Sequence, residues 1–291
     1  MKDLAGKVAV ITGAGSGFGR EFARIAVHER MRLVLADVQQ DALEAVTAEC
    51  RAQGAEALAV ATDVSNAAEV RQLADRTIAK LGAVHLLFNN AGVAGAGGYV
   101  WETSDEDWRW LLGVNLMGVV NGIRSFVPLM LKQDCECHVV NTASAAGLVS
   151  APLMSVYNAS KHGVVTVSET LFNDLRLANA NVGVSVLCPA FVPTNIHASE
   201  RNRPPELTRA APPTASQLAA RERSEKAVGS GRLSAAEVAR MTFDAVRESR
   251  FYVITHAKML ASVELRLRDV LAGRNPSDPY TFKPDVAVKP R

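Results

Sequence analysis

Short runs of apolar, mostly β-branched residues alternate along the chain with longer segments whose apolar positions recur at helical spacing. The short runs are typical of strands buried on both faces of a sheet, and the segments between them are typical of amphipathic helices. This alternation predicts strand–helix–strand units and therefore a parallel sheet. Seven strands are expected, at residues 7–12, 32–37, 57–63, 84–90, 138–144, 183–189 and 250–256.

Helices are expected between and after these strands. They are predicted near residues 17–30, 40–53, 66–81, 104–133, 156–179, 234–249 and 258–272. Ser234 and Glu237 have the spacing of a capping box, which marks the start of the sixth helix. The predicted fold class is therefore α/β: a doubly wound, Rossmann-like seven-stranded parallel sheet flanked by helices, in a single domain.

The regular alternation is interrupted after Pro189. Residues 190–232 contain two pairs of prolines among many arginines and glutamates, which predicts a mobile loop with one helical piece. Residues 1–273 are expected to form one domain. The proline-spaced residues 274–291 are predicted to be a tail that lies on the surface or on a neighbouring subunit.

Composition excludes several classes of function. The chain has 291 residues, 48% of them hydrophobic, and a net charge of +2, so it lacks the basic surface that nucleic-acid binding requires. No window approaches a membrane span, and the first apolar run is too short for a signal peptide. Four cysteines without zinc-site spacing predict free thiols and no metal. A cytoplasmic protein with a small-molecule substrate is expected.

The segment TGAGSGFGRE, residues 12–21, joins the first strand to the first helix. The general G-x-G-x-x-G fingerprint fits no register of it, because the spacing is Gly13, Gly17 and Gly19, with Gly15 extra. Such a turn still lets the backbone approach a pyrophosphate, whose charge the helix N-terminus stabilises. The segment therefore predicts a dinucleotide site.

The segment SVYNASKHGV places Tyr157 one helical turn before Lys161, so that the two side chains are neighbours on one face. A phenol with a pKa near 10 is a poor base at neutral pH. One unit charge at about 5 Å is worth ~3 kcal/mol, or about two pKa units. Lys161 is therefore predicted to lower the pKa of Tyr157 and to make it an acid/base.

Three motifs occur in a characteristic order: T-G-x-x-x-G-x-G at residues 12–19, N-N-A-G at 89–92 and Y-x-x-x-K at 157–161. Together they resemble the short-chain dehydrogenase/reductase family, over about residues 5–195. The resemblance implies hydride transfer between a nicotinamide cofactor and a carbinol carbon. It implies four catalytic residues: Asn115, which would hold a water beside the lysine, Ser144, which would donate to the reacting oxygen, Tyr157 and Lys161.

The resemblance also implies a set of cofactor contacts at the ends of the strands. They are Gly13, Ser16, Gly17, Phe18, Gly19, Asp37, Asp63, Val64, Asn90, Gly92, Tyr157, Lys161, Val192 and Thr194. Asp37 can accept hydrogen bonds from the adenosine ribose, where a 2′-phosphate would meet a carboxylate. NAD is therefore expected rather than NADP, with Arg20 as the nearby opposing charge. Ala190 departs from the glycine usual after Pro189, so the shape of the pocket floor is in doubt.

The side chains expected around the carbinol are almost all apolar. They are Val93, Ala94, Ala145, Ala146, Leu148, Leu153, Met154 and Phe191. Such a pocket favours a hydrophobic or aromatic secondary alcohol, because a hydroxyl-rich substrate would lose hydrogen bonds on entry.

Two other functions remain open at this point. A 3-hydroxyacyl-CoA dehydrogenase would use Arg201, Arg203 and Arg209 for the phosphates of CoA, although loop arginines more often form a solvated face. A non-catalytic dinucleotide-binding sensor is the other possibility. Trp101, Trp108 and Trp110 are predicted to pack the fourth helix against a partner subunit, with a ligand-stacking group as the alternative. The resemblance to the family suggests a homo-oligomer, a tetramer or a dimer.

Overall fold

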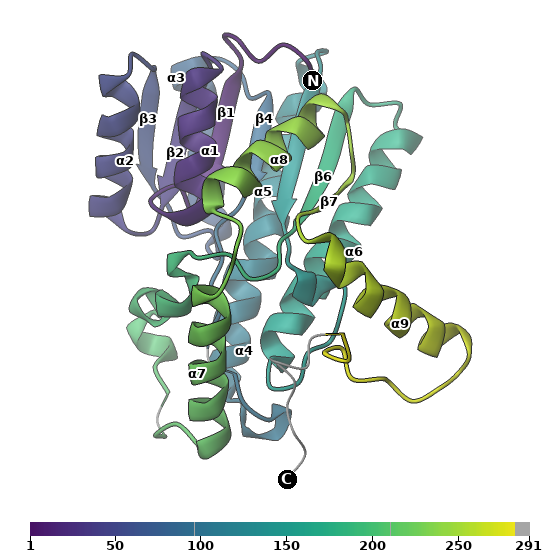
Figure 1. The fold of residues 1–291 in the computed structure, drawn as a ribbon. Coiled ribbons are helices and arrows are strands. Elements are labelled where there is room, and N and C mark those ends of the chain that lie inside the picture. The colour runs from purple at the N-terminus through teal and green to yellow at the C-terminus, as the bar shows by residue number, and fades with distance from the viewer. Residues whose placement is uncertain (96, 210, 283–291) are drawn as a thin grey trace.

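Seven parallel strands form one sheet in the order β3-β2-β1-β4-β5-β6-β7 (Figure 1). The computed structural model describes residues 1–95, 97–209 and 211–282. The strands are β1 Val8–Thr12, β2 Arg32–Asp37, β3 Ala57–Ala61, β4 Leu86–Asn89, β5 Cys137–Thr142, β6 Val182–Cys188 and β7 Tyr252–Ile254. The order reverses direction between β1 and β4, and open α/β sheets bind ligands at such a switch point.

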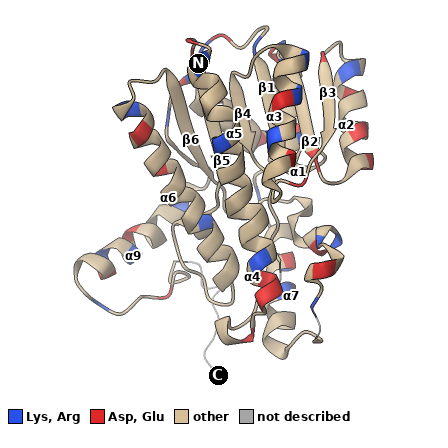
Figure 2. Cartoon of the chain, turned by 180° about the vertical axis from the view of Figure 1, so that it is seen from behind, with Lys and Arg blue, Asp and Glu red and all other residues tan. Residues whose placement is uncertain are grey.

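Helices cover both faces of the sheet. In Figure 1, α1 Gly17–His28, α2 Gln40–Ala52 and α8 Ala235–Arg247 lie across one face. Figure 2 shows α3 Ala67–Leu81, α5 Gly118–Lys132 and α6 Ser155–Leu177 on the other.

The two faces follow from the alternation of side chains along each strand. Ile11 packs in the same core cluster as Phe22 of α1, whereas Val10 packs in the cluster that contains Phe126 of α5. The predicted doubly wound, seven-stranded parallel fold is confirmed.

The long fourth helix predicted at residues 104–133 is helical throughout but not uniform. It consists of α4 Asp105–Leu111, a π-helical stretch Leu112–Met117, and α5. The expectation that no segment approaches a membrane span was too strong, because Asp105–Lys132 is long enough and has a mean hydropathy of 1.4 over its most apolar part. The reason is that this helix packs on the sheet, where Phe126, Val127 and Met130 are core residues.

The irregular region after β6 contains more regular structure than the single helical piece predicted. Two 3-10 segments, Asn195–Asn202 and Pro205–Leu207, precede the helix α7 Ala215–Gly229. The start of α7 is fixed because the hydroxyls of Thr214 and Ser216 both donate to the Glu102 carboxylate. The two ends of this excursion lie together, since a Cβ on Gly231 would be 2.6 Å from the Phe191 carbonyl oxygen.

The C-terminal segment that follows the helix α9 Leu260–Leu271 folds back and contacts this helix. The Ser277 backbone N–H donates to Asp269 at 2.9 Å, and the Ser262 hydroxyl donates to the Pro279 carbonyl at 2.8 Å. Residues 274–278 are exposed, as expected of a tail, whereas residues 279–280 are half-buried against the chain itself. The rest of the predicted tail, 283–291, lies outside the described residues.

His138 is a buried imidazole in β5 that the sequence did not single out. Its Nε2 lies 2.8 Å from the Ser185 hydroxyl, which itself donates to the Arg250 carbonyl at 2.7 Å. Because the single hydroxyl proton is used in that bond, Nε2 of His138 must be the donor to Ser185. Burial lowers the pKa of His138 to about 3, so the folded chain keeps this imidazole neutral.

The protein is predicted to lose stability through His138 as the pH falls from about 6.5 to about 3. In that window the unfolded chain binds a proton that the folded chain does not, so the free energy of unfolding decreases by about 1.4 kcal/mol per pH unit from this group. His138→Gln keeps a donor but cannot titrate. Urea unfolding at several pH values should therefore give a shallower acid slope for the variant, and identical slopes would contradict the assignment.

Candidate active site

One cavity of about 1230 Å³ lies at the carboxyl ends of the strands. Its wall includes residues that directly follow β1, β2, β3, β4, β5 and β6, because parallel strands all end at this edge of the sheet. The far side is formed by residues 194–207, by α7 and by residues 279–280. The cavity therefore joins the predicted cofactor and substrate regions in one continuous space.

The glycine loop after β1 has the features of an anion cradle. Gly13 and Gly17 have φ values of +65° and +52°, which are backbone conformations that favour glycine. Ser16 precedes α1 without a side-chain cap, and the first turn of the helix holds no acidic residue. The first N–H groups of α1 are thus left for an anion such as a pyrophosphate.

Asp37 faces the same cavity from the end of β2. Its two carboxylate oxygens accept hydrogen bonds from the Gly15 and Gln39 backbone N–H groups, at 2.8 and 2.9 Å. These bonds hold the carboxylate beside the glycine loop, where an adenosine ribose would be recognised. Arg20 lies outside the cavity lining and pairs with Glu49 at 2.8 Å. The residues present therefore fit a dinucleotide with an unphosphorylated ribose.

Gly19 differs from Gly13 and Gly17 because it does not line the cavity. A Cβ at this position would lie 2.1 Å from the Gly13 carbonyl oxygen, so only glycine allows α1 to pack this closely on the turn. Gly19 therefore has a packing role in the predicted cofactor loop.

Most of the remaining predicted cofactor residues line the cavity. They are Ser16, Phe18, Asp63, Val64, Asn90, Gly92, Val192 and Thr194. The Asn90 side-chain amide is already engaged, since it donates to the Thr12 carbonyl at 2.9 Å. Asp63 accepts from the Ser65 backbone N–H at 2.9 Å.

Thr12 is a contributor that sequence reasoning missed. Its hydroxyl accepts from the Asn90 and Ala91 backbone N–H groups, and it ties the end of β1 to the segment after β4. Its place at the start of the glycine motif was the available signal.

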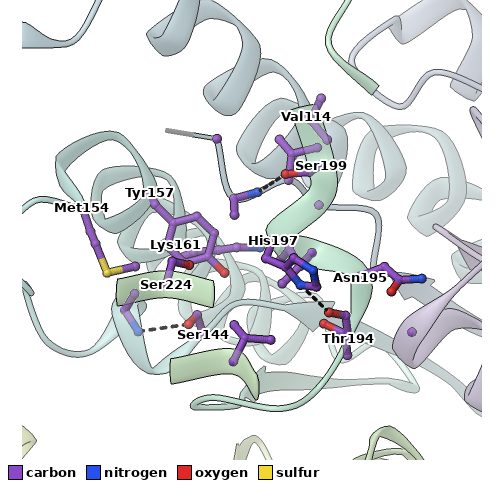
Figure 3. A pocket seen from close by; sticks show the side chains of 18 of the residues that line it. Val114, Ser144, Met154, Tyr157, Lys161, Thr194, Asn195, His197, Ser199 and Ser224 are labelled. Carbon is purple, nitrogen blue, oxygen red and sulfur yellow. Dashed lines mark hydrogen bonds between the residues drawn. The ribbon is translucent and has the colours of Figure 1, made fainter. Parts of the chain in front are cut away.

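Ser144, Tyr157 and Lys161 meet on one wall of the cavity (Figure 3). Ser144 follows β5 and accepts a hydrogen bond from the Ala146 backbone N–H at 3.1 Å. Tyr157 and Lys161 project from the first turns of α6. The two elements are brought together at Gly147, where a Cβ would lie 2.6 Å from the Lys161 carbonyl oxygen. Close packing at one glycine therefore places the serine beside the tyrosine.

Lys161 is buried and Tyr157 is half-buried in the cavity wall, which changes the electrostatics expected from their spacing. Burial raises the pKa of Tyr157, and the Ser144 hydroxyl opposes that rise in part. Burial lowers the pKa of Lys161 to about 8. The pKa of Tyr157 is therefore shifted in the direction opposite to the one predicted from the Lys161 charge, because removal from water disfavours the charged form of either group.

Lys161 has a defined position. Its ammonium Nζ donates to the Thr142 carbonyl at 3.0 Å and lies 5.7 Å from the centre of the Tyr157 ring. A Cβ on Gly92 would be 3.5 Å from the same Nζ, so glycine keeps the space beside the ammonium open.

Asn115 lies in the π-helical stretch between α4 and α5 and is fully buried. Its amide accepts from the Val93 backbone N–H at 2.8 Å and donates to the Val93 carbonyl at 2.9 Å. A further bond at 3.1 Å reaches the Ser160 hydroxyl on α6. Asn115 therefore joins the segment after β4 to the helix that carries Tyr157, rather than bonding to its own helix.

The substrate side of the cavity is largely apolar, as predicted. Val93, Ala94, Ala145, Ala146, Leu153, Met154 and Phe191 line it, and so does Ala190. Leu148 is an exception, because it packs beneath the sheet with Val164 and Val165 of α6. Leu153 has a φ of +64°, an unusual backbone for leucine, and its carbonyl accepts from the Gly98 backbone N–H at 2.9 Å.

The three tryptophans do not act as one group. Trp110 is buried and lines the cavity, which contradicts its predicted packing against a partner subunit. Trp108 packs in the same cluster and donates to the Thr103 hydroxyl at 2.9 Å. Trp101 stacks on Tyr99 and is 77% exposed.

The three loop arginines differ in their surroundings. Arg203 and Arg209 pair with Asp107, at 2.7 and 2.8 Å, and are not a solvated face. Arg201 remains exposed at the cavity, where it donates to the Gln39 side chain at 3.3 Å.

Comparison with known proteins identifies the family. Residues 7–205 match the family model described as short chain dehydrogenase. The chain belongs to the short-chain dehydrogenase family. The matched residues include the glycine loop, Asp37, Asn115, Ser144, Tyr157 and Lys161.

One solved structure and two curated proteins are similar to this chain over most of its length. A short chain dehydrogenase/reductase from Burkholderia phymatum, crystallised in complex with NAD, is 56% identical with a TM-score of 0.94 and covers 96% of this chain and 99% of that one. A "CLA biosynthesis dehydrogenase/reductase" from Lactiplantibacillus plantarum is 33% identical, with 95% and 97% covered. A "1-deoxy-11-beta-hydroxypentalenate dehydrogenase" from Streptomyces exfoliatus is 34% identical, with 91% and 87% covered.

Proposed function

We propose that this short-chain dehydrogenase is an NAD-dependent oxidoreductase that interconverts a hydrophobic or aromatic secondary alcohol and its ketone. The observation that carries the proposal is the meeting of Ser144, Tyr157 and Lys161 on the wall of one cavity. That cavity also contains the glycine loop and Asp37. An acid/base group and a dinucleotide cradle in one continuous space are what carbinol oxidation requires.

NAD, when bound, supplies the acceptor for the hydride that leaves the carbinol carbon. The glycine loop and the start of α1 would hold its pyrophosphate, and Asp37 its adenosine ribose. Val192 and Thr194 would meet the carboxamide. Lys161 would hold the nicotinamide ribose, since its ammonium is fixed by Thr142 and faces the open space beside Gly92.

Tyr157 would exchange the proton of the substrate oxygen. Because burial raises the pKa of Tyr157, the phenol is protonated at neutral pH and is a donor to a ketone oxygen. In the oxidation direction the phenol must first release its own proton, and the same oxygen atom then takes the proton from the alcohol. Ser144 would supply a second hydrogen bond to the reacting oxygen, and Asn115 would keep α6 in register with the segment after β4.

The substrate class follows from the apolar lining around Tyr157. Burial of apolar surface contributes about 25 cal/mol per Å², whereas a polyol would leave several hydroxyls without partners. Two of the three arginines that a CoA thioester would need are already paired with Asp107. This pairing disfavours the 3-hydroxyacyl-CoA alternative.

The proposal includes a cytoplasmic location and assembly into a homo-oligomer, a tetramer or dimer. Four free cysteines suit a reducing compartment. Exposed apolar side chains on α9, which projects from the body of the molecule in Figure 1, suit association between subunits. They are Leu260, Leu267, Val270 and Leu271.

A substrate panel tests the proposed activity directly. With NAD as acceptor, kcat/KM is expected to be highest for 1-phenylethanol or a hydroxysteroid, because these bury apolar surface in the pocket. A polyol and a 3-hydroxyacyl-CoA should be much poorer substrates. The appearance of NADH is the measurement. A polyol or the thioester as clearly the best substrate would contradict the apolar-pocket assignment, and no turnover with any alcohol would favour the sensor.

Replacement of Tyr157 by phenylalanine tests the acid/base assignment. Tyr157→Phe is expected to lower kcat by at least ~10²-fold, because the proton donor is lost while the ring remains. NAD affinity, measured by fluorescence titration, should change little. Tyr99→Phe is the matched control, since Tyr99 is exposed and outside this cavity. Normal turnover by the Tyr157 variant would refute the mechanism.

Titration with both cofactors tests the role of Asp37. NADP is expected to bind at least ~10-fold more weakly than NAD, because charge-assisted hydrogen bonds to the ribose are replaced by repulsion of the 2′-phosphate. Asp37→Asn should reduce this preference. Equal dissociation constants in the unmodified protein would contradict the assignment, and Arg201→Gln would then show whether that guanidinium binds the phosphate.

A further inference from the structure

The segment from Thr194 to Arg209, called the lid segment here, forms the far wall of the cavity. Figure 3 shows Thr194, Asn195, His197 and Ser199 along this ribbon, across from Tyr157 and Lys161. Its regular structure is limited to two short 3-10 segments, so backbone hydrogen bonds of its own do little to hold it. Side-chain contacts to the rest of the molecule must therefore fix its position.

Asp107 provides the central contact. It lies in the first turn of α4, it is 1% exposed, and one of its oxygens accepts from both Arg203 and Arg209, at 2.7 and 2.8 Å. Its other oxygen accepts from the Ser104 backbone N–H at 3.3 Å, as part of the capping box of α4. The helix and the lid segment thus share one buried carboxylate.

Glu200 closes the network from within the lid segment. It accepts from Arg203 at 2.8 and 3.0 Å and from Arg209 at 3.3 Å. The Arg203 side chain is 6% exposed, and its guanidinium lies 4.2 Å from the centre of the Trp110 ring. Trp110 lines the cavity, so the same arginine that pairs with Asp107 also fixes a wall of the substrate pocket.

A buried carboxylate is stable only while its partners are in place, because an unpaired charge in the interior is strongly unfavourable. Movement of the lid segment away from α4 would leave Asp107 without both guanidinium groups. The network therefore favours one position of the lid segment. In that position the Ser199 hydroxyl accepts from the Ala94 backbone N–H at 3.0 Å, beside the N-N-A-G motif.

We propose that Asp107 is a positioning residue that holds the lid segment over the cavity and thereby sets the affinity for the alcohol substrate. The inference rests on the proposed function, because it assigns Asp107 to the substrate side of the same site. Asp107 acts through Arg203, Arg209 and Trp110 and does not touch the reacting atoms. Both arginines that pair with Asp107 lie outside the cavity lining.

The test compares Asp107→Asn with Asp105→Asn. Asp105 lies on the same helix and is exposed, so the second variant has the same change in charge without loss of the network. With 1-phenylethanol as the probe, Asp107→Asn is expected to raise KM at least ~10-fold and to change kcat by less than ~3-fold, because substrate binding rather than the proton transfer is affected. Asp105→Asn should resemble the unmodified enzyme, and Asp107→Glu should recover part of the loss.

Trypsin gives a readout that does not depend on activity. Cleavage after Arg201 should be at least ~5-fold faster in Asp107→Asn than in Asp105→Asn, because the lid segment opens more often when its partner charge is removed. If Asp107→Asn fails to fold, Arg209→Gln, which removes only one of the two pairs, is measured instead. Equal KM values and equal cleavage rates would overturn the inference, and so would a loss of kcat with KM unchanged. Absence of turnover in the unmodified enzyme would refute the proposed function, while the cleavage rates would still decide the role of Asp107.

Discussion

The shared direction of the strands is the constraint on which the site depends. Parallel pairing of β1, β2, β4, β5 and β6 brings the residues that follow each strand to one edge of the sheet. The glycine loop, Asp37, the segment that contains Gly92, and Ser144 all follow such ends. If any one strand ran in the opposite direction, its contribution would lie at the other edge, far from the cavity. Backbone hydrogen bonding between parallel strands therefore determines which residues lie together at this edge of the sheet.

Short-range patterns in the sequence predicted the sheet correctly and indicated that Tyr157 and Lys161 are neighbours, because both features depend on local rules. Strand alternation, helix spacing and the i, i+4 relation of Tyr157 and Lys161 are all set within a few residues. The position of the lid segment was not predictable in this way. The pairing of Asp107 with Arg203 and Arg209 spans about 100 residues, and no periodicity in the sequence indicates which loop arginine meets a buried acid and which stays in water.

Burial explains the other differences between expectation and structure. Spacing alone predicts attraction between the Lys161 ammonium and the Tyr157 phenolate, but it contains no information about desolvation. Lys161 is buried and Tyr157 is half-buried, so desolvation opposes charge on each of them. Packing is also absent from short-range patterns. Gly19 packs against the Gly13 carbonyl, and Leu148 packs against the cluster that contains Val164 and Val165 of α6.

The proximity of Phe191 and Gly231 has a consequence for how enzymes of this architecture diverge. The excursion between them supplies the lid segment and α7, yet it leaves and re-enters the body of the protein at nearly the same point. A segment whose two ends already lie together can be exchanged or lengthened at little cost in loop-closure entropy. Strands β1 to β6 and Tyr157 all lie before this insertion. The lid segment and α7 can therefore change in sequence and length independently of the strands and of Tyr157, provided that the spacing of the two anchor points is kept.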